Sequence, residues 1–508
     1  VVVIICSIAF VYIPQLSRIV RANVMAAYGE DYVRAVIVSG ARAPWILTRH
    51  VMRNTAAPVL VFATVLVADA IILEASLTFI GSGLQATTVA TWGNVLSEAS
   101  SNLSVLLGKW WTAFFPGLFI MITVLCLNIL SEGITDAMVA APASAAVAQV
   151  DKDSAEQAES LQARLDDLES VEGKRTDRFE AHLEKTPLLE VNDLCIKFER
   201  HGNVNVVDHV SFKVRPGETM GLVGESGCGK SITALTIMGL IDPKAEITGE
   251  ILYQGENLLE KSAEERRALL GHEMAMIYQD ALSSLNPAML IKTQMRQLTS
   301  RGGTRSAVEL LELVGLDPKR TLESYPHELS GGQRQRVLIA MALTRDPKLI
   351  IADEPTTALD VTVQKQVIAL LNELREKLGF AMIFVSHDLA LVAEVAHHIT
   401  VMYAGQVIEQ APTKELLTHP THEYTRGLLG AVLSIEAGSG RLHQVPGTVP
   451  SPRDFPVGDR FAPRSSHPDY GLDIRPVLTE VGPEHVYAAL PSRDEAATQE
   501  TTGKEETR

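Results

Sequence analysis

Residues 224–231 read Gly-Glu-Ser-Gly-Cys-Gly-Lys-Ser, the pattern of a loop that binds phosphate groups. Backbone N–H groups of such a loop cradle the phosphates, its lysine contacts the β- and γ-phosphates, and its last hydroxyl ligates Mg2+. The lysine here is Lys230 and the hydroxyl is that of Ser231. Three glycines permit the tight path of the backbone. The predicted nucleotide contacts are Gly224, Glu225, Ser226, Gly227, Cys228, Gly229, Lys230 and Ser231.

Two further motifs follow the loop in the chain. Residues 329–333 read Leu-Ser-Gly-Gly-Gln, and residues 349–352 form an apolar run that ends in Asp353-Glu354. Average residue usage gives the loop pattern by chance in roughly 2% of chains of this length, and the five-residue motif in about one in a thousand. Chance therefore does not explain both in this order. The two carboxylates suit a division of labour in which Asp353 holds Mg2+ through water and Glu354 polarises the attacking water.

Short apolar runs should position these residues. Residues 220–223 and 349–352 predict buried strands, and residues 384–386 end a third. A helix is expected to begin near Lys230, so that its positive end faces the phosphates. The pattern predicts an α/β nucleotide-binding domain.

The 508-residue chain is long enough for several domains. Its net charge of −16 and pI near 5.4 argue against a nucleic-acid partner held by a basic surface. The four cysteines are scattered and form neither a metal-binding spacing nor a disulfide framework, which suits a reducing cytosol.

Apolar residues concentrate in the first 140 positions. Residues 59–80 and 112–130 are long enough to cross a bilayer as helices, with buried soluble helices as the alternative. Residues 1–13 are apolar but too short, and they are expected to be the end of a membrane helix whose beginning is missing. Asp69 and Glu74 interrupt the first full run, and a carboxylate at that depth is costly unless it faces protein or water.

Loop charges predict the orientation. Residues 14–55 carry six arginines against Glu30 and Asp31, whereas residues 81–111 carry only Lys109 and Glu98. Basic loops stay in the cytoplasm, so residues 14–55 should face inward and 81–111 outward. The second full span then returns the chain to the cytoplasm.

Polar segments flank the soluble part. Residues 139–186 are rich in alanine and charged residues and predict a flexible or partly helical linker, with a short coiled coil as the alternative. Residues 481–508 are expected to form a disordered tail, most clearly from about Pro491 onward.

These motifs together resemble the ABC ATPases. The resemblance implies catalytic roles for Glu354 as general base and for His387 and Gln279 at the γ-phosphate and the attacking water. It implies Mg2+ ligation by Ser231, Gln279 and Asp353. It also implies ATP contacts from Ser330, Gly331, Gly332 and Gln333 across a pair of domains, with Asp360 in the loop that crosses between them. Phe198 stands where the family stacks an aromatic ring on adenine, and a core aromatic is the equal alternative.

The chain is more specifically similar to the dipeptide, oligopeptide and nickel ABC importers. The supporting stretches are residues 28–54, which match a permease coupling loop at Ala35 and Gly40, residues 74–83, and residues 419–429. Some members hold an iron–sulfur cluster on cysteines near the segment that reads Gly-Asp-Arg-Phe-Ala-Pro-Arg-Ser at 458–465. Because no cysteine remains there, no cluster is predicted.

The expected fold is an α-helical transmembrane segment followed by an α/β P-loop ATPase domain with a helical subdomain. The expected domains are a permease part over 1–138, the linker, an ABC ATPase over 187–418 and an importer-type extension over 419–480. The chain is predicted to be a multi-pass protein of the cytoplasmic membrane, with its ATPase in the cytoplasm.

The function implied is ATP-driven import of peptides, or of nickel and related small solutes, coupled through residues 28–54. The implied cofactors are ATP and Mg2+. Implied partners are membrane lipid, a second ATPase domain (a second copy or a paralogue), a second permease subunit and an external solute-binding protein, because two spans and a stub cannot enclose a pathway. The alternatives are an exporter, a soluble ABC ATPase of repair or translation, and a non-catalytic assembly or regulatory remnant.

Overall fold

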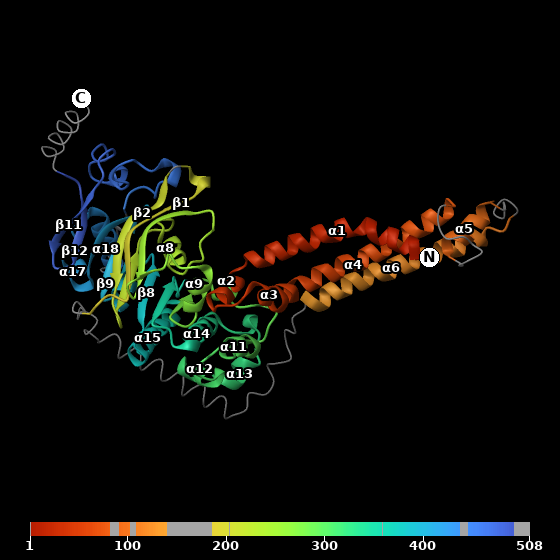
Figure 1. Ribbon diagram of the computed structural model, residues 1–508, viewed down its shortest axis with the longest axis horizontal. Coiled ribbons are helices and arrows are strands. Elements are labelled where there is room, and N and C mark those ends of the chain that lie inside the picture. Colours follow the sequence, from red (N-terminus) through yellow and green to blue (C-terminus); the bar gives the residue numbers. More distant parts are fainter. Residues whose placement is uncertain are drawn as a thin grey trace. The chain divides into compact units, whose positions relative to one another are not determined.

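The computed structural model describes residues 2–81, 91–101, 108–139, 185–202, 204–357, 359–436 and 445–491 (Figure 1). The chain forms two compact units. The first contains residues 1–33 and 42–151, and the second contains residues 34–41 and 152–508. We call the first the helical unit and the second the soluble unit. The short segment 34–41 thus belongs with the soluble unit, although the residues on both sides of it in sequence belong to the helical unit.

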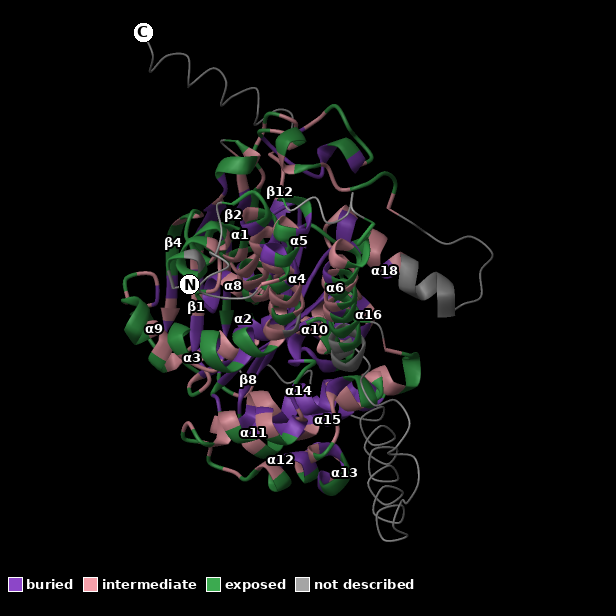
Figure 2. Cartoon of the chain, turned by 90° about the vertical axis from the view of Figure 1, so that its right-hand side faces the viewer, coloured by how far each residue is buried: buried purple, intermediate pink, exposed green. Residues whose placement is uncertain are grey.

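The first unit is helical where it is described. Its elements are α1 (Val2–Gly29), α3 (Ala43–Ile46), a π-helical turn (Leu47–Val51), α4 (Met52–Phe79), α5 (Trp92–Ser101) and α6 (Trp111–Val139), and α2 (Asp31–Val38) leads from it into the second unit. Three helical stretches are long and apolar enough to cross a membrane: Ile5–Gly29, Pro58–Phe79 and Trp111–Gly133. At most 17% of each apolar window is buried within the protein (Figure 2), so these faces suit a lipid environment.

The two predicted full spans at 59–80 and 112–130 correspond to helices in α4 and α6. The prediction of a partial span at 1–13, with a cytoplasmic loop from residue 14, is wrong. Helix α1 passes through Pro14 without ending and continues to Gly29. A proline removes one backbone hydrogen bond, and a long helix in an apolar medium retains the others. The segment between the first two apolar helices is therefore shorter than residues 14–55.

The second unit contains two described sheets. An antiparallel sheet has the order β2-β1-β4-β5, with β1 at Leu189–Lys197, β2 at Asn205–Val214, β4 at Glu246–Tyr253 and β5 at Glu256–Asn257. The larger sheet has the order β11-β12-β10-β9-β3-β8-β7-β6. Its strands are β3 (Thr219–Val223), β6 (Met274–Ile277), β7 (Leu349–Asp353), β8 (Ala381–Ser386), β9 (His398–Tyr403), β10 (Gln406–Pro412), β11 (Val477–Gly482) and β12 (His485–Ala489).

Eight more of the described helices belong to this unit. They are α8 (Lys230–Ile237), α9 (Ala263–Leu269), α10 (Ala281–Ser284), α14 (Gly331–Ala342), α15 (Val361–Leu378), α16 (Leu389–Val395), α17 (Thr413–Thr418) and α18 (Glu423–Glu436). Of these, α8, α14, α16, α17 and α18 contact strands of the larger sheet. A helical subdomain is formed by α11 (Ile291–Thr299), α12 (Ala307–Leu313) and α13 (Pro318–Leu322), which lie side by side in Figures 1 and 2. Strands β3, β7 and β8 are buried along their whole length, as expected of parallel strands covered on both faces.

The parallel register places three strand ends at one edge of the sheet. Val223 of β3 lies opposite Ser386 of β8, and Asp353 of β7 lies opposite Val385. The residues that follow β3, β7 and β8 therefore meet at the carboxyl edge, where ligands bind in open α/β sheets. The phosphate loop, Glu354 and His387 all follow strands that end at this edge.

The C-terminal extension departs from the expected boundaries. Strands β11 and β12 form an antiparallel hairpin that reaches residue 489, and β12 pairs with β10. The expected disordered tail therefore does not begin at residue 481, because backbone pairing with the central sheet continues beyond it. The rest of that tail, residues 492–508, and most of the expected linker, residues 140–184, lie outside the described residues.

Candidate functional site

The phosphate loop connects β3 to α8. Gly227 and Gly229 have φ values of 85° and 97°, a region that residues with a side chain rarely adopt. Gly229 is the N-cap of α8, so the helix begins at Lys230, as the sequence predicts. The loop thus presents backbone N–H groups and a helix N-terminus at the sheet edge, an arrangement that favours bound phosphate.

Lys230 is bound by the loop itself. Its Nζ donates to the carbonyl oxygens of Gly224 at 2.6 Å and Glu225 at 3.1 Å, and it lies 3.6 Å from Sγ of Cys228. Only 4% of Lys230 is exposed. The ammonium group therefore lies inside the loop. A phosphate that binds there would replace neutral carbonyls with a charged acceptor, which forms a stronger hydrogen bond with the ammonium group.

Ser231 and Asp353 meet beneath the loop. The Ser231 hydroxyl donates to Oδ1 of Asp353 at 3.0 Å. Burial raises the pKa of the Asp353 carboxyl to about 6; the Ser231 hydrogen bond opposes this shift, and the nearby Glu354 charge adds to it. A hydroxyl and a carboxylate side by side offer the oxygen ligands that Mg2+ prefers, so these two residues fit the predicted metal site.

Glu354 gathers three polar side chains. Its Oε2 accepts from Nε2 of Gln279 at 2.8 Å and from the hydroxyl of Thr357 at 3.0 Å, and its Oε1 lies 3.4 Å from Nδ1 of His387. The backbone of Glu354 has a φ of 45° and its N–H donates to the carbonyl of Val385. A glutamate seldom takes this conformation, so the surrounding contacts must hold it there.

The structure thus brings together predicted residues from four separate stretches of the sequence. Gln279 follows β6, Glu354 follows β7 and His387 follows β8, while Lys230 and Ser231 follow β3. A carboxylate, an amide and an imidazole at the end of a phosphate loop suit hydrolysis of a phosphoanhydride, since they can orient water and accept its proton.

The signature peptide starts α14. Ser330 is its N-cap: the hydroxyl accepts from the N–H of Gln333, and the Gln333 side chain accepts from the N–H of Ser330 at 2.9 Å. This capping box leaves the Ser330 O–H proton to donate elsewhere. Gly331 and Gly332 form the first helical turn, where N–H groups have no partner within the helix and can accompany that hydroxyl.

Asp360 caps α15 by accepting from the N–H of Val363 at 2.9 Å. Phe198 is 8% exposed within a core cluster, and the Arg200 guanidinium lies over its ring at 5.0 Å. In this structure the core alternative therefore describes Phe198 better than an open stacking platform. Cys228 is 0% exposed and burial raises the pKa of its thiol, so it packs as a small unreactive side chain inside the loop.

Sequence reasoning missed two groups of residues around the site. The Thr357 hydroxyl donates a hydrogen bond to Glu354. In the sequence, this contact is indicated only by the position of Thr357 three residues after the glutamate. Tyr424 and Arg464 contact Glu225 from positions 199 and 239 residues further along the chain. No local pattern predicts such contacts, because the tertiary fold creates them.

Residues 34–41 pack within the soluble unit. Val38 is 5% exposed in the same core cluster as Leu270 and Met274, and the Ser39 hydroxyl accepts from Arg301 at 3.2 Å. Helix α2 ends at Val38, and Gly40 follows with a φ of 79°, which turns the chain sharply. This segment lies within residues 28–54, the predicted coupling loop.

A cavity of about 620 Å³ lies within the helical unit. Glu74, Trp92 and apolar side chains of α4 and α5 line it. Glu74 accepts a hydrogen bond from Thr78 at 2.9 Å. The carboxylate that the sequence marks as costly thus has one polar partner and faces a cavity.

Three sequence families match separate parts of the chain. Residues 1–141 match the binding-protein-dependent transport system inner membrane component, and residues 207–357 match the ABC transporter family. Residues 408–468 match the oligopeptide/dipeptide transporter C-terminal region. The membrane segment, the nucleotide domain and the extension are thus each assigned independently.

Individual relatives match a little more than half of the chain. A dipeptide transport ATP-binding protein of Haemophilus influenzae is 43% identical over 319 residues, which is 61% of this chain and 97% of that protein. An oligopeptide transport ATP-binding protein of Bacillus subtilis is 46% identical over 56% of this chain and 82% of that protein. A peptide import ATP-binding protein of Brucella abortus is 46% identical over 56% and 88%. The chain therefore belongs to the oligopeptide/dipeptide branch of the ABC transporter family, with a permease-type membrane segment joined to its ATPase.

Proposed function

We propose that this protein uses ATP hydrolysis to drive import of peptides across the cytoplasmic membrane. The observation that carries the proposal is the meeting of Lys230, Ser231, Asp353 and Glu354 at one sheet edge, in a chain that also has a permease-type segment. The peptide as substrate is supported by the names of the three relatives given above, each of which refers to peptide import or to dipeptide or oligopeptide transport. Nickel and related small solutes remain the alternative cargo.

ATP binding follows from the loop. The triphosphate lies along the N–H groups of residues 225–231, and Lys230 exchanges its carbonyl partners for the β- and γ-phosphates. Ser231, Asp353 and Gln279 would hold Mg2+, which neutralises phosphate charge when bound. Asp360 and the signature residues serve the partner domain, so each ATP is held between two ATPase domains.

Hydrolysis follows from the cluster at Glu354. Gln279 and Thr357 orient the carboxylate, which accepts a proton from the attacking water. The water oxygen bonds to the γ-phosphorus as the bond to the β–γ bridging oxygen breaks, which yields ADP and phosphate. His387 donates a hydrogen bond to the γ-phosphate, and Ser330, Gly331 and Gly332 of the second domain bind its other side.

Residues 34–41 transmit the change to the membrane. Because they are packed in the soluble unit while their neighbours in sequence belong to the helical unit, motion of the ATPase must pull on α1 and the helices that follow. A second permease subunit and a second ATPase domain complete the assembly, and an external binding protein delivers the peptide. In the membrane, residues 81–111 face outward and the ATPase faces the cytoplasm, as the loop charges indicate.

Reconstitution tests the proposal. Full-length protein is placed in lipid vesicles with the candidate second permease, ATPase and binding protein, and the movement of a labelled peptide is followed after ATP is supplied on the ATPase side. We expect peptide to move from the binding-protein side to the ATPase side only when ATP is hydrolysed. Movement in the opposite direction would identify an exporter, and recovery of the ATPase outside the membrane fraction would favour a soluble ABC ATPase.

A further inference from the structure

One residue of the phosphate loop is held from outside the nucleotide motifs. The N–H of Glu225 donates to the Tyr424 hydroxyl at 3.0 Å, its carbonyl accepts from Lys230, and its carboxylate accepts from both terminal nitrogens of Arg464. Tyr424 lies on α18, and Arg464 ends a short 3-10 turn at Ala462–Arg464 in the C-terminal extension. We propose that Arg464 is a positioning residue for the phosphate loop, so that the docked extension sets the affinity of the site for ATP.

The guanidinium of Arg464 is fully occupied. Its Nε donates to the carbonyl of Pro446 at 2.6 Å, and its terminal nitrogens reach the carbonyls of Val445 and Gly447 at 3.3 and 3.2 Å as well as the Glu225 carboxylate. The side chain is 5% exposed. The planar guanidinium has five N–H donors and can reach all of these acceptors at once, whereas the ammonium group of a lysine could reach only some of them. Arg464 therefore orients the Glu225 carboxylate as well as balancing its negative charge.

Aromatic rings enclose the pair. Tyr403 and Tyr424 are fully buried, with ring centroids 4.9 Å apart, and Phe461 of the extension packs against Tyr403 at 5.3 Å. The Tyr403 hydroxyl also accepts from Arg464 at 3.4 Å. Partial exclusion of water strengthens the ion pair and makes loss of either partner costly, since the remaining charge is left without compensation.

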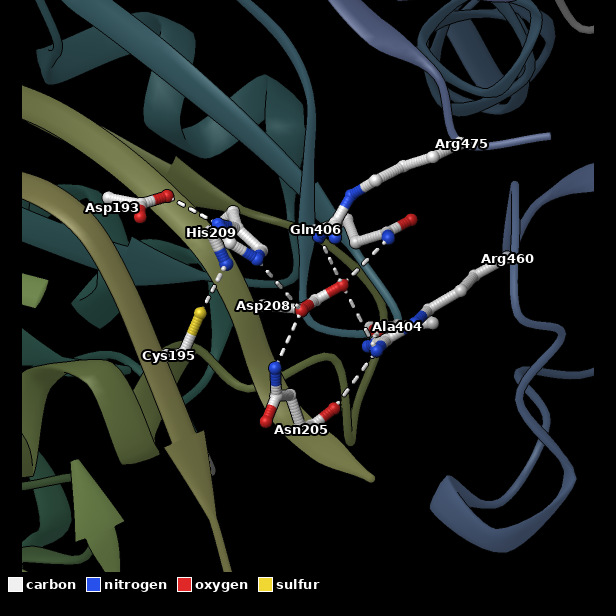
Figure 3. A network of polar contacts seen from close by, with 9 residues as sticks. All are labelled: Asp193, Cys195, Asn205, Asp208, His209, Ala404, Gln406, Arg460 and Arg475. Atoms are coloured by element: carbon white, nitrogen blue, oxygen red, sulfur yellow. Dashed lines mark hydrogen bonds and ion pairs between the residues drawn. The ribbon is translucent and has the colours of Figure 1, made fainter. Parts of the chain in front are cut away.

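A second set of contacts anchors the same extension away from the loop (Figure 3). The Asp208 carboxylate on β2 accepts from Arg475 at 2.7 Å and lies 3.3 Å from Arg460, which also donates to the carbonyls of Ala404 and Asn205. Donor atoms of Cys195, Asp208 and His209 lie within 4.8 Å of one another, a spacing that could suit a metal. Two arginines already neutralise Asp208, and His209 pairs with Asp193, so this cluster is an anchor of the extension.

The two sets of contacts make different predictions. Arg475 helps to hold the extension on the sheet, whereas Arg464 also holds Glu225. If docking alone mattered, loss of either arginine would act alike on ATP binding. If Arg464 positions the loop, its loss should weaken ATP binding and the loss of Arg475 should not. The inference rests on ATP binding at residues 224–231, which is part of the proposed function.

The experiment measures ATP affinity of the full chain in detergent micelles by equilibrium binding of labelled ATP. The variants are Arg464→Gln, Glu225→Gln, the double variant, and Arg475→Gln as the matched control. We expect each of the first two to raise the Kd for ATP about ten-fold, the middle of the range for coupled polar pairs, and the double variant to raise it no further. Arg475→Gln should bind ATP like the parent.

Turnover separates positioning from general damage. At saturating ATP, kcat of Arg464→Gln should stay within about two-fold of the parent, because Glu354, Gln279 and His387 are untouched, while KM rises with Kd. If Arg464→Gln does not fold, Glu225→Gln removes the same pair from the more exposed side and should show the same rise in Kd.

Three results would overturn the inference: an unchanged Kd in Glu225→Gln, effects of the two substitutions that simply multiply in the double variant, or an equal loss in Arg475→Gln. Failure of the parent protein to bind ATP would instead refute the proposed function, so the two failures are distinguishable.

Discussion

Glu354 combines a strained backbone with three polar partners. Its φ of 45° is costly for a side chain of this size, and the contacts from Gln279, Thr357 and His387 hold the carboxylate at the carboxyl ends of β6, β7 and β8. Strain of this kind collects at functional sites because only the surrounding fold can maintain it. The base is thus oriented before any nucleotide arrives.

Replacement of the base tests its role. Glu354→Gln keeps the size and one hydrogen-bond acceptor but cannot take a proton from water. We expect the Kd for ATP to stay within about two-fold of the parent and phosphate release to fall by about 10²–10⁴-fold, the usual contribution of a general base. Single-turnover phosphate release and ATP binding on the same preparation would check this. Phosphate release at the parent rate would assign the base elsewhere.

Asp353 should make the nucleotide-free protein sensitive to pH. Burial raises its pKa to about 6, above the ordinary value of 3.8, so the ionised carboxyl destabilises the folded state fully above about pH 6 and not at all below the ordinary value. Asp353→Asn keeps an oxygen for Ser231 and carries no charge. We expect its Tm to exceed that of the parent at pH 7.5, and the difference to shrink toward pH 5.

Thermal unfolding without nucleotide or Mg2+, measured from pH 5 to 8, checks this prediction. Asp346→Asn, at an exposed ion pair with Arg305, serves as the control and should show no comparable trend. A Tm difference for Asp353→Asn that is constant across the range would show that burial does not shift this carboxyl.

Among single residues, the sequence predicted which side chains would lie together at the carboxyl edge of the larger sheet. Lys230, Ser231, Gln279, Asp353, Glu354 and His387 meet where expected, because each motif follows an apolar strand and parallel strands end at one edge. Phe198 could not be decided from sequence, since burial of an aromatic ring depends on what packs over it, and here Arg200 does. Arg464 could not be found at all, because nothing in its local sequence indicates contact with Glu225.

Among the elements, α2 is unusual in joining the two units. Its last residue, Val38, packs with Leu270 and Met274, and Gly271 approaches the backbone of Ser39, so that a side chain at 271 would have little room. The resemblance of residues 28–54 to a permease coupling loop predicted a role in coupling but no helix bounds. The longer helix α1 was missed, because Arg18 and Arg21 made residues 14–29 resemble a loop.

Disrupting the packing of Val38, the last residue of α2, should uncouple transport from ATP hydrolysis. Val38→Asp places an unpaired carboxylate in an apolar cluster. The free-energy cost of burying that charge should displace residues 34–41 from the cluster. We expect ATP affinity to remain near that of the parent and peptide uptake per ATP hydrolysed to fall by about ten-fold or more. The matched control is Val308→Asp on α12, where the valine is 44% exposed.

Uptake and phosphate release would be measured in the same vesicles. Equal coupling in Val38→Asp and Val308→Asp would show that residues 34–41 do not transmit the change.

For the whole molecule, the signature and the phosphate loop are expected to serve different ATP molecules. Ser330 caps its own helix and retains a proton to donate, which fits contact with a γ-phosphate bound by another domain. Ser330→Asp can still cap α14 but presents a carboxylate to that phosphate. We expect ATPase activity to fall by about a hundred-fold while the Kd for ATP in the variant's own loop changes little.

Binding and turnover of the full chain with its partner subunits would test this arrangement. Ser330→Thr, which keeps the hydroxyl and the cap, is the control and should retain most activity. A parallel loss of ATP binding and turnover in Ser330→Asp would indicate that the signature belongs to the variant's own site.

The pairing of β12 with β10 has a practical consequence for anyone who shortens this chain. Removal of the hairpin at 477–489 would leave the N–H and C=O groups of β10 open along one side, and an unprotected strand edge recruits strands from other molecules. Truncated protein would then aggregate, and the loss of activity would be misread as loss of a catalytic part. Single substitutions that leave this edge covered are the safer way to learn what the extension does.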